Sequence, residues 1–382
     1  MDKIYVSHNS IVSCLGNDSQ TVIQKIKDGV SGLQPVNDPK LLDQPLCTSQ
    51  INIEKIPKTI RGKAKEEIFT RLEHMLLNSL GKVIQASKIE LTDRVGLIIS
   101  TTKGNIDVLD DDNPFPKERA YLAELGKVLK EFFGFRTHPI VLSNACVSGL
   151  LAIATAKKMI LQGDFDHVFV TGGDLASKFT LSGFRAFQAL SSVPCRPYDK
   201  NRSGINIGEV GTSALVTKDD TKLAREAVII LGDASCNDAN HISGPSRTGE
   251  GLYRAVKLAL KEAKLQPKDI DFISAHGTAT QFNDEMEAIA FNRLKLQNTP
   301  LNSLKGYFGH TLGASGLLET IVGMHSLHQN TVIASMGFEE IGVSQPINII
   351  RRTESRPMDT FLKTSSGFGG SNTAVVFKKV AE

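Results

Sequence analysis

The chain has 382 residues, of which 41% are hydrophobic and 22% charged, as in a soluble globular protein. Its length predicts two domains or a duplicated one. Its net charge of +3, from 44 basic and 41 acidic residues, is too small to predict a nucleic-acid partner. No apolar run approaches the ~20 residues of a membrane span, and the N-terminus lacks the pattern of a signal peptide.

The cysteines indicate the compartment. There are five, they are widely scattered, and they include no CxxC pair: Cys14, Cys47, Cys146, Cys195 and Cys236. An odd number of scattered cysteines argues against a disulfide framework. We therefore expect a protein of the reducing cytoplasm.

Strand and helix patterns alternate along the first half of the chain. Strands are predicted at 3–7, 95–100, 140–142 and 167–171, and helices at 20–29, 120–133 and 147–161. A further helical pattern ends near Ser87, whereas 38–56 and 107–116 are predicted to be irregular. The apolar strand at 95–100 is of the kind that is buried on both faces.

The second half continues this alternation. Alanine- and valine-rich segments occupy 212–216 and 227–231. Strands are predicted at 270–274 and 373–378, helices at 249–264, 282–294 and 313–327, and a loop at 305–310. Strands and helices that alternate at this spacing predict α/β layers.

Cys146 lies at the turn between the strand at 140–142 and the helix at 147–161. Free amide groups at a helix start favour a thiolate, and the small neighbours Ser143, Ala145 and Ser148 would leave the sulfur approachable. A nucleophile on a sharp strand-to-helix turn is a known catalytic arrangement. Taken alone, Cys146 is better interpreted as a buried structural cysteine, since free cysteines are among the most buried residues.

Two histidines occupy similar junctions. His276 directly follows a strand, and His310 directly precedes a helix. Such junctions gather at one edge of an α/β sheet, and cysteine with histidine indicates nucleophilic acyl chemistry. A papain-like protease also has a histidine far downstream of its cysteine. Here, however, Cys146 is mid-chain, no C-G-S-C-W signature surrounds it, and a second histidine has no role in a protease.

Four motifs in order resemble a known family. They are N-A-C-V-S-G-L at 144–150, A-H-G-T-A-T at 275–280, S-L-K-G-Y-F-G-H-T-L-G-A-S-G at 303–316 and S-S-G-F-G-G-S-N at 365–372. Together they resemble β-ketoacyl-acyl carrier protein synthases of the Cys-His-His, chain-elongating branch of the thiolase superfamily. The resemblance covers nearly the whole chain. It implies a five-layer αβαβα thiolase-like α/β fold of two similar halves, 1–225 with the nucleophile and 226–382 with both histidines.

The resemblance implies a decarboxylative Claisen condensation between an acyl thioester and malonyl-carrier protein. Cys146 would carry the acyl group. His276 and His310 would stabilise the enolate left by decarboxylation, which suits two imidazole N–H donors. Lys305 would orient that pair, and Glu319 would support Lys305.

The last motif would complete the site. The backbone N–H groups of Cys146 and Phe368 would hold the tetrahedral oxygen, and Phe368 would gate the pocket. Gly367, Gly369 and Gly370 would let the backbone approach the substrate closely. A packing role for Phe368 is the alternative.

The resemblance also implies the ligand and the partners. Thr278 and Thr280 would bind phosphopantetheine, unless they only cap a strand end. That arm would arrive on acyl carrier protein, with no permanent metal or redox cofactor. The subunits would form a homodimer, or a heterodimer with a related subunit.

Carrier proteins are acidic, so basic residues are candidates for docking. The chain offers Lys63, Lys65, Arg71, Lys200 and Arg202. The alternative is that these side chains only keep the surface hydrated.

Three departures from the family pattern point to an altered acyl pocket. Ser366 replaces the usual aromatic residue two positions before Phe368, Gly306-Tyr307-Phe308 follow Lys305, and the segment 191–195 is short. Fatty acid, polyketide and aryl polyene synthesis are the candidate pathways. A catalytically weak chain-length partner is an alternative, although such partners lose the nucleophile and this chain retains Cys146.

Overall fold

The computed structural model describes residues 3–56, 69–238 and 240–380. They form a mixed 11-stranded sheet to which both halves of the chain contribute. From the first half come β1 (Tyr5–Ser13), β8 (Val210–Thr217), β6 (His167–Asp174), β4 (Val95–Ser100) and β5 (Ile140–Leu142). From the second half come β9 (Val228–Asn237), β16 (Ser371–Lys379), β15 (Thr360–Gly367), β10 (Phe272–Ser274), β11 (Pro300–Asn302) and β13 (Asn348–Ile349).

The two halves repeat one strand pattern. In the order β1-β8-β6-β4-β5 the first two pairings are antiparallel and the next two parallel, and β9-β16-β15-β10-β11 follows the same sequence of pairings. The halves join where β1 pairs with β9, Tyr5 opposite Ile229. The predicted similarity of the two halves is thus visible in the strand order.

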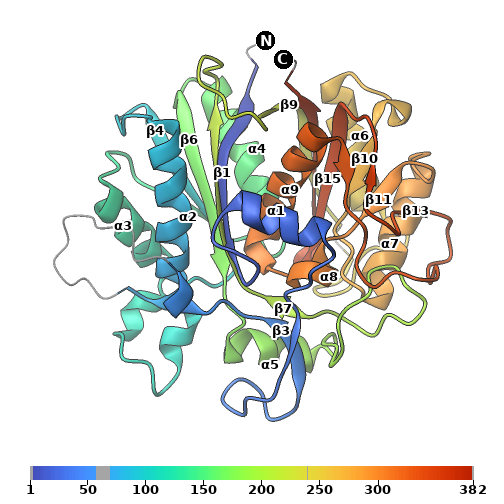
Figure 1. Cartoon of the computed structure of the whole chain (residues 1–382), viewed down its shortest axis with the longest axis horizontal. Coiled ribbons are helices and arrows are strands. Elements are labelled where there is room, and N and C mark those ends of the chain that lie inside the picture. The colour runs from blue at the N-terminus through green and yellow to red at the C-terminus, as the bar shows by residue number, and fades with distance from the viewer. Residues whose placement is uncertain (1–2, 57–68, 239, 381–382) are drawn as a thin grey trace.

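Helices complete a five-layer arrangement (Figure 1). α4 (Ser148–Leu161) and α9 (Ser315–Gln329) pack against each other in the middle. α2 (Arg71–Ser87) and α3 (Leu122–Phe133) cover the outer face of the first half, and α6 (Glu250–Ala263) and α7 (Gln281–Arg293) cover that of the second. The predicted αβαβα thiolase-like architecture is confirmed.

Strand β4 shows why the core requires these sequences. Leu97 and Ile99 pack in the cluster below α2, whereas Ile98 packs in the central cluster around α4 and α9. Successive side chains of a strand point to opposite faces, so a strand covered on both faces must be apolar throughout.

Most predicted elements are present, and several differ in detail. The first strand extends to Ser13, and α1 (Ser19–Lys27) begins after Asp18, whose side chain accepts a hydrogen bond from the Thr21 N–H. The polar stretch at 38–56, predicted to be irregular, contains β3 (Leu46–Ser49). The predicted loop at 305–310 begins with the short helix α8 (Lys305–Phe308). Strand β15 and α5 (Lys178–Ala186) were not predicted.

The remaining elements are short. The strands are β2 (Gln34–Val36), β7 (Ile207–Gly208), β12 (Thr331–Val332) and β14 (Glu354–Ser355). The 3-10 helices are Ile53–Lys55, Ile106–Leu109, Lys117–Ala120, Pro267–Asp269, Leu312–Ala314 and Phe368–Gly370. Among the described residues, none of the helices is both long and apolar enough to cross a membrane.

Candidate active site

Cys146 lies in the tight turn between β5 and α4, where the chain bends sharply. Ala145 has a positive φ of 44°, and the Ser148 hydroxyl ties the turn by donating to the Ala145 carbonyl at 2.7 Å and accepting from the Asn144 N–H at 2.8 Å. A Cβ atom placed on Gly367 would lie 3.0 Å from the Cys146 nitrogen. Gly367 therefore lets the last motif approach the backbone of the cysteine closely.

The ionisation of Cys146 differs from the sequence expectation. Burial raises the pKa of its thiol to about 11, against the lowering that Lys305 and Lys103 exert. The removal of the sulfur from water outweighs the nearby cations, because desolvation disfavours the charged form. The expected thiolate is therefore wrong for the resting site, which holds a neutral thiol.

His276 follows strand β10 and is held through its backbone. Glu287 of α7 accepts from the His276 N–H at 2.9 Å and from the Gly277 N–H at 2.7 Å. The Lys305 ammonium donates to the His276 carbonyl at 2.7 Å and lies 3.5 Å from Nδ1 of the His276 ring. A cation beside Nδ1 requires that this nitrogen be an acceptor, which leaves the ring proton on Nε2.

His310 precedes α9, and the groups around its Nδ1 again determine which ring nitrogen carries the proton. Its Nδ1 accepts from the Leu312 N–H at 3.3 Å and lies 2.9 Å from the Ser315 hydroxyl. The ring proton is therefore assigned to Nε2. The buried Nε2 has no hydrogen-bond partner among the described residues, so it is a free donor that faces the site.

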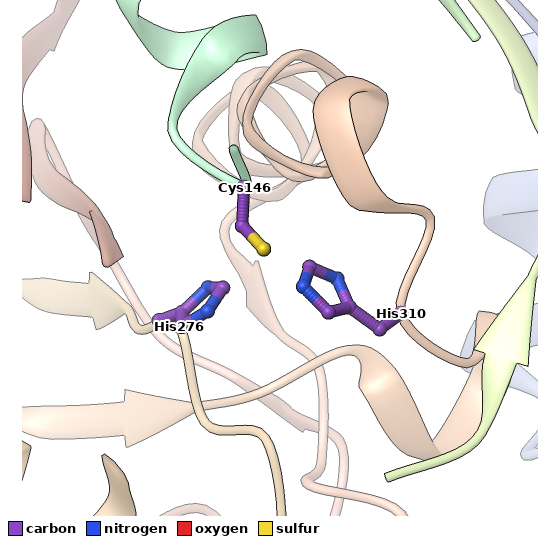
Figure 2. Close-up of side chains that lie close together, drawn as sticks. All are labelled: Cys146, His276 and His310. Atoms are coloured by element: carbon purple, nitrogen blue, oxygen red, sulfur yellow. The ribbon is translucent and has the colours of Figure 1, made fainter. Parts of the chain in front are cut away.

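The three predicted side chains meet in space and point toward one another (Figure 2). The Cys146 sulfur and the ring nitrogens of His276 and His310 lie within 4.8 Å of one another. The rings are 5.2 Å apart between centroids and nearly perpendicular, at 79°. Burial, with Lys305 next in importance, holds the pKa of both histidines well below 6.5. Both rings are thus neutral, and each offers one N–H donor near the sulfur.

Lys305 lies beside Nδ1 of His276, and Glu319 lies beside Lys305. These are the two residues that the resemblance named as supports of the histidine pair. Both side chains are buried, and the Lys305 ammonium is 2.8 Å from Oε1 of Glu319. The ion pair lets a charged lysine stay in the interior next to the histidine. Sequence reasoning missed a second lysine here: Lys363 of β15 is 2.7 Å from Oε2 of the same carboxylate.

A cavity of about 510 Å³ opens onto Cys146, His276 and His310. Thr278 and Thr280 line it with hydroxyls 2.8 Å apart, and Phe368 lines it as well. Lining residues that sequence reasoning did not single out as site residues include Phe184, Phe187, His241 and Phe282. The Phe368 ring stacks on Phe184 at 5.7 Å between centroids and meets Phe187 edge-on at 5.3 Å. Phe184 and Phe187 are the two aromatic residues of the stretch G-F-R-A-F-Q at 183–188. Nothing in that stretch shows which of its side chains face a cavity.

The basic residues proposed for docking differ in their exposure and in their partners. Lys63 and Lys65 lie outside the described residues. Arg202 is buried, donates to the Gly342 carbonyl and lies 3.8 Å from Asp284, so it is wrong as a surface contact. Arg71 is partly buried and pairs with Glu209 at 2.6 Å. Lys200 is exposed and pairs with Glu340 at 3.1 Å.

Comparisons with known proteins agree with this site. The family model for the N-terminal domain of β-ketoacyl synthases matches residues 1–221, and the model for the C-terminal domain matches 227–339. The chain therefore belongs to the β-ketoacyl synthase family, whose members are acyltransferases. The papain-like alternative is wrong.

Individual relatives match over nearly the full length. A 3-oxoacyl-[acyl-carrier-protein] synthase 2 of Coxiella burnetii is 26% identical over 99% of both chains. Among solved structures, the complex of a ketosynthase with its chain length factor from Xenorhabdus doucetiae gives a TM-score of 0.86 at 25% identity, covering 99% of this chain and 98% of that one. The ishigamide ketosynthase/chain length factor superimposes with a TM-score of 0.89 at 22% identity over 100% of both chains, which supports the fold alone.

Proposed function

We propose that this chain is a β-ketoacyl-carrier protein synthase that joins an acyl thioester to a malonyl thioester by decarboxylative Claisen condensation. The observation that carries the proposal is the pair of neutral histidines whose rings face the Cys146 sulfur in one cavity, where Nε2 of His310 has no hydrogen-bond partner among the described residues. The site draws its nucleophile from 1–225 and its histidines from 226–382, which we take as the two domains.

In the first step the Cys146 sulfur attacks the acyl thioester carbon. The new acyl-cysteine bond forms as the carbon–sulfur bond to the phosphopantetheine arm breaks, and the departing thiolate takes the proton of the Cys146 thiol. The oxygen of the tetrahedral intermediate needs preorganised donors. We assign this role to the backbone N–H groups of Cys146 and Phe368. Because Gly367 has no side chain, the segment that carries Phe368 can lie close to the backbone of Cys146.

In the second step a malonyl thioester loses carbon dioxide. The electrons of the breaking carbon–carbon bond pass to the thioester, and negative charge develops on its oxygen. The Nε2–H groups of His276 and His310 are placed to donate to that oxygen from two directions. Fixed donors in a closed site stabilise such a charge without reorganisation when it forms.

In the third step the enolate carbon attacks the acyl group on Cys146. The β-ketoacyl thioester leaves on the malonyl carrier, and the Cys146 sulfur takes up a proton to restore the thiol. Two kinds of negatively charged intermediate form, a tetrahedral oxyanion in the first and third steps and an enolate in the second, and the site offers a separate set of donors for each kind.

Acyl carrier protein is the proposed partner, and it would deliver phosphopantetheine. The support is the relatives' names and the paired hydroxyls of Thr278 and Thr280 at the cavity, which suit the polar groups of a pantetheine arm. Whether the pathway makes a fatty acid, a polyketide or an aryl polyene depends on which acyl and carrier groups enter this cavity.

A dimer is proposed on the evidence of the sheet. Strand β5 is its edge strand, is half-buried and carries only apolar side chains at Ile140, Val141 and Leu142. Exposed strand edges pair readily with another chain. The structural relative from Xenorhabdus doucetiae is a ketosynthase bound to its chain length factor, so a related subunit is as acceptable a partner as a second copy. An inactive role for this chain is disfavoured, because Cys146 is present and faces the cavity.

Substitution of each histidine tests the proposal. His276→Ala and His310→Ala should each slow carbon dioxide release from a malonyl thioester by about 10²- to 10³-fold, the cost of one oxyanion donor. Acylation of Cys146, followed by mass spectrometry, should change far less. His138→Ala, at an exposed histidine, is the matched control. Full decarboxylation in both variants would refute the assigned role of the pair.

A further inference from the structure

The site contains a second buried lysine that the resemblance did not assign. Lys363 lies in the middle of β15, and its side chain is fully buried. Its ammonium is 2.7 Å from Oε2 of Glu319, while the Lys305 ammonium is 2.8 Å from Oε1. One carboxylate therefore pairs with two cations, and a second buried carboxylate, Glu287, lies near enough for its charge to act on Lys363.

The two lysines bind consecutive carbonyl groups of the segment that leads to His276. Lys363 donates to the carbonyls of Ser274 at 3.1 Å and Ala275 at 3.3 Å. Lys305 donates to the next carbonyl, that of His276, at 2.7 Å. The backbone that sets the direction of the His276 ring is thus fixed by two ammonium groups, and both are oriented by Glu319.

We propose that Lys363 is a positioning residue for His276 and also supplies a fixed positive charge for the decarboxylation step. The proposal rests on the proposed function and deepens it. Lys305 alone could pair with Glu319, so Lys363 is not needed to neutralise that carboxylate. Besides this ion pair, Lys363 donates hydrogen bonds to the backbone before His276 and, at 2.6 Å, to the Thr364 carbonyl of its own strand.

The energetics of burial support a functional role. An ammonium without water is costly unless it is paired and hydrogen-bonded. Burial lowers the pKa of Lys363, and the Glu319 carboxylate opposes that shift. Replacement of a whole buried ion pair by apolar residues is often neutral or stabilising, so the pairing with Glu319 does not by itself explain a lysine at this position. The buried ammonium is therefore best explained by the reaction, in which a negatively charged enolate forms beside His276.

The charge of Lys363 reaches both histidines. It is among the cations that lower the pKa of His276 and of His310. The titratable or charged groups that surround His276 are Cys146, Glu287, Lys305, His310, Glu319 and Lys363. Because a nearby cation disfavours an imidazolium, loss of Lys363 should raise the pKa of the His276 ring.

Two substitutions separate positioning from charge. Lys363→Met removes both the donors and the charge, whereas Lys363→Gln retains an N–H donor for the carbonyls. Glu319 stays paired with Lys305 in each variant, so both should fold, which thermal unfolding checks. Carbon dioxide release from a malonyl thioester should fall about tenfold or more in Lys363→Met and less in Lys363→Gln, below the effect of losing an oxyanion donor outright. Acylation of Cys146 should stay within about threefold of wild type.

A measurement that needs no activity completes the test. Nuclear magnetic resonance of labelled histidine rings should show a higher titration midpoint for His276 in both variants. A wild-type protein that releases no carbon dioxide would overturn the proposed function, and the ring titration would still decide the role of Lys363. An unchanged midpoint, or equal losses in acylation and decarboxylation, would show that Lys363 only supports the fold.

Discussion

The position and the ionisation of Cys146 both depend on the residues directly around it. Its turn requires Ala145 at positive φ, a hydroxyl from Ser148 and a missing side chain at Gly367. The same closure that shapes the turn removes water, and burial raises the pKa of the thiol to about 11. The sulfur is therefore poised to lose its proton only as it attacks a bound acyl group.

Cys146→Ala should separate the half-reactions. Without the sulfur no acyl intermediate can form, so condensation should fall by about 10³-fold or more, as when a covalent nucleophile is removed. Decarboxylation of a malonyl thioester should remain within about tenfold, because both histidine donors are untouched. Product and carbon dioxide are measured in the same sample. Normal condensation by this variant would show that another residue is the nucleophile.

The histidines define the pH dependence of decarboxylation. Their pKa values lie well below 6.5, so lowering the pH to 6.5 should not protonate either ring. The rate of carbon dioxide release from a malonyl-pantetheine thioester should therefore be flat from pH 8 to pH 6.5 and fall only at lower pH. A half-maximal rate at or above pH 6.5 would mean that at least one ring titrates like a solvated histidine.

Strand β15 is one of the elements that sequence reasoning failed to predict, and it carries much of the site. Its sequence T-F-L-K-T-S-S-G has polar residues at positions that the structure buries. Strands are predicted from apolar alternation, and this strand lacks it because Lys363 and Ser366 contact buried polar groups. In contrast, β4 and β5 were predicted with correct bounds, since each is a short apolar run between turns.

Motif order placed the three central residues correctly, because strand ends of an α/β layer converge. The fold and the meeting of Cys146, His276 and His310 were therefore predictable. The burial of Arg202 was not, because its partner Asp284 is distant in sequence and nothing in R-P-Y-D-K-N-R shows which cation faces inward. The pKa of Cys146 was misjudged for the same reason, since burial is a property of the assembled layers.

Ser366 near the end of β15 is expected to set the size of the acyl pocket. It lines the cavity and donates to Asn372 at 2.8 Å. Ser366→Phe should fill part of the cavity and lower kcat/KM for long acyl groups about tenfold relative to acetyl, within the range for apolar pocket contacts. Ser366→Ala removes the same hydrogen bond without filling space. Equal shifts of the acyl preference in both variants would show that the hydrogen bond matters and pocket size does not.

Gly367 makes a second prediction for the same strand end. A Cβ there would lie 3.0 Å from the Cys146 nitrogen and 3.2 Å from the Ala145 Cβ, so Gly367→Ala must displace the nucleophile turn. The turn must give by a few tenths of an ångström, less than the 1 Å that can cost about 10²-fold, so Cys146 acylation should slow by about tenfold. Gly183→Ala, where a Cβ meets nothing within 4 Å, is the control. Unimpaired acylation in Gly367→Ala would argue against the close approach.

At the scale of the whole molecule, the site exists only because the two halves meet. The nucleophile comes from the start of α4 and the histidines from the junctions around β10 and α9, and α4 packs on α9. The proposed partner, acyl carrier protein, would therefore have to reach this cavity through its phosphopantetheine arm. Surface charge can then affect docking without changing the chemistry below.

Charge reversal at Lys63 and Lys65 tests docking. These residues are predicted from the sequence alone to attract an acidic carrier, since clustered surface cations speed encounter with an anion. Lys63→Glu with Lys65→Glu should raise KM for carrier-bound substrate several-fold and leave a small pantetheine thioester unaffected. Lys261→Glu with Lys268→Glu, at exposed lysines of the second half, is the control. Equal losses with both substrates would indicate damage to the fold, and no effect would place docking on another face.

The central claim is that Cys146 carries the acyl group that a malonyl-derived enolate then attacks. Intact-protein mass spectrometry with peptide mapping tests it most directly, first with a panel of acyl-carrier proteins and then after malonyl-carrier protein is added. The predicted result is an acyl adduct on Cys146 that disappears on addition of malonyl-carrier protein, with release of carbon dioxide and a carrier-bound β-ketoacyl product lengthened by the remaining malonyl carbons. An adduct on another residue, or an acyl-Cys146 that persists after malonyl-carrier protein is added, would contradict the account.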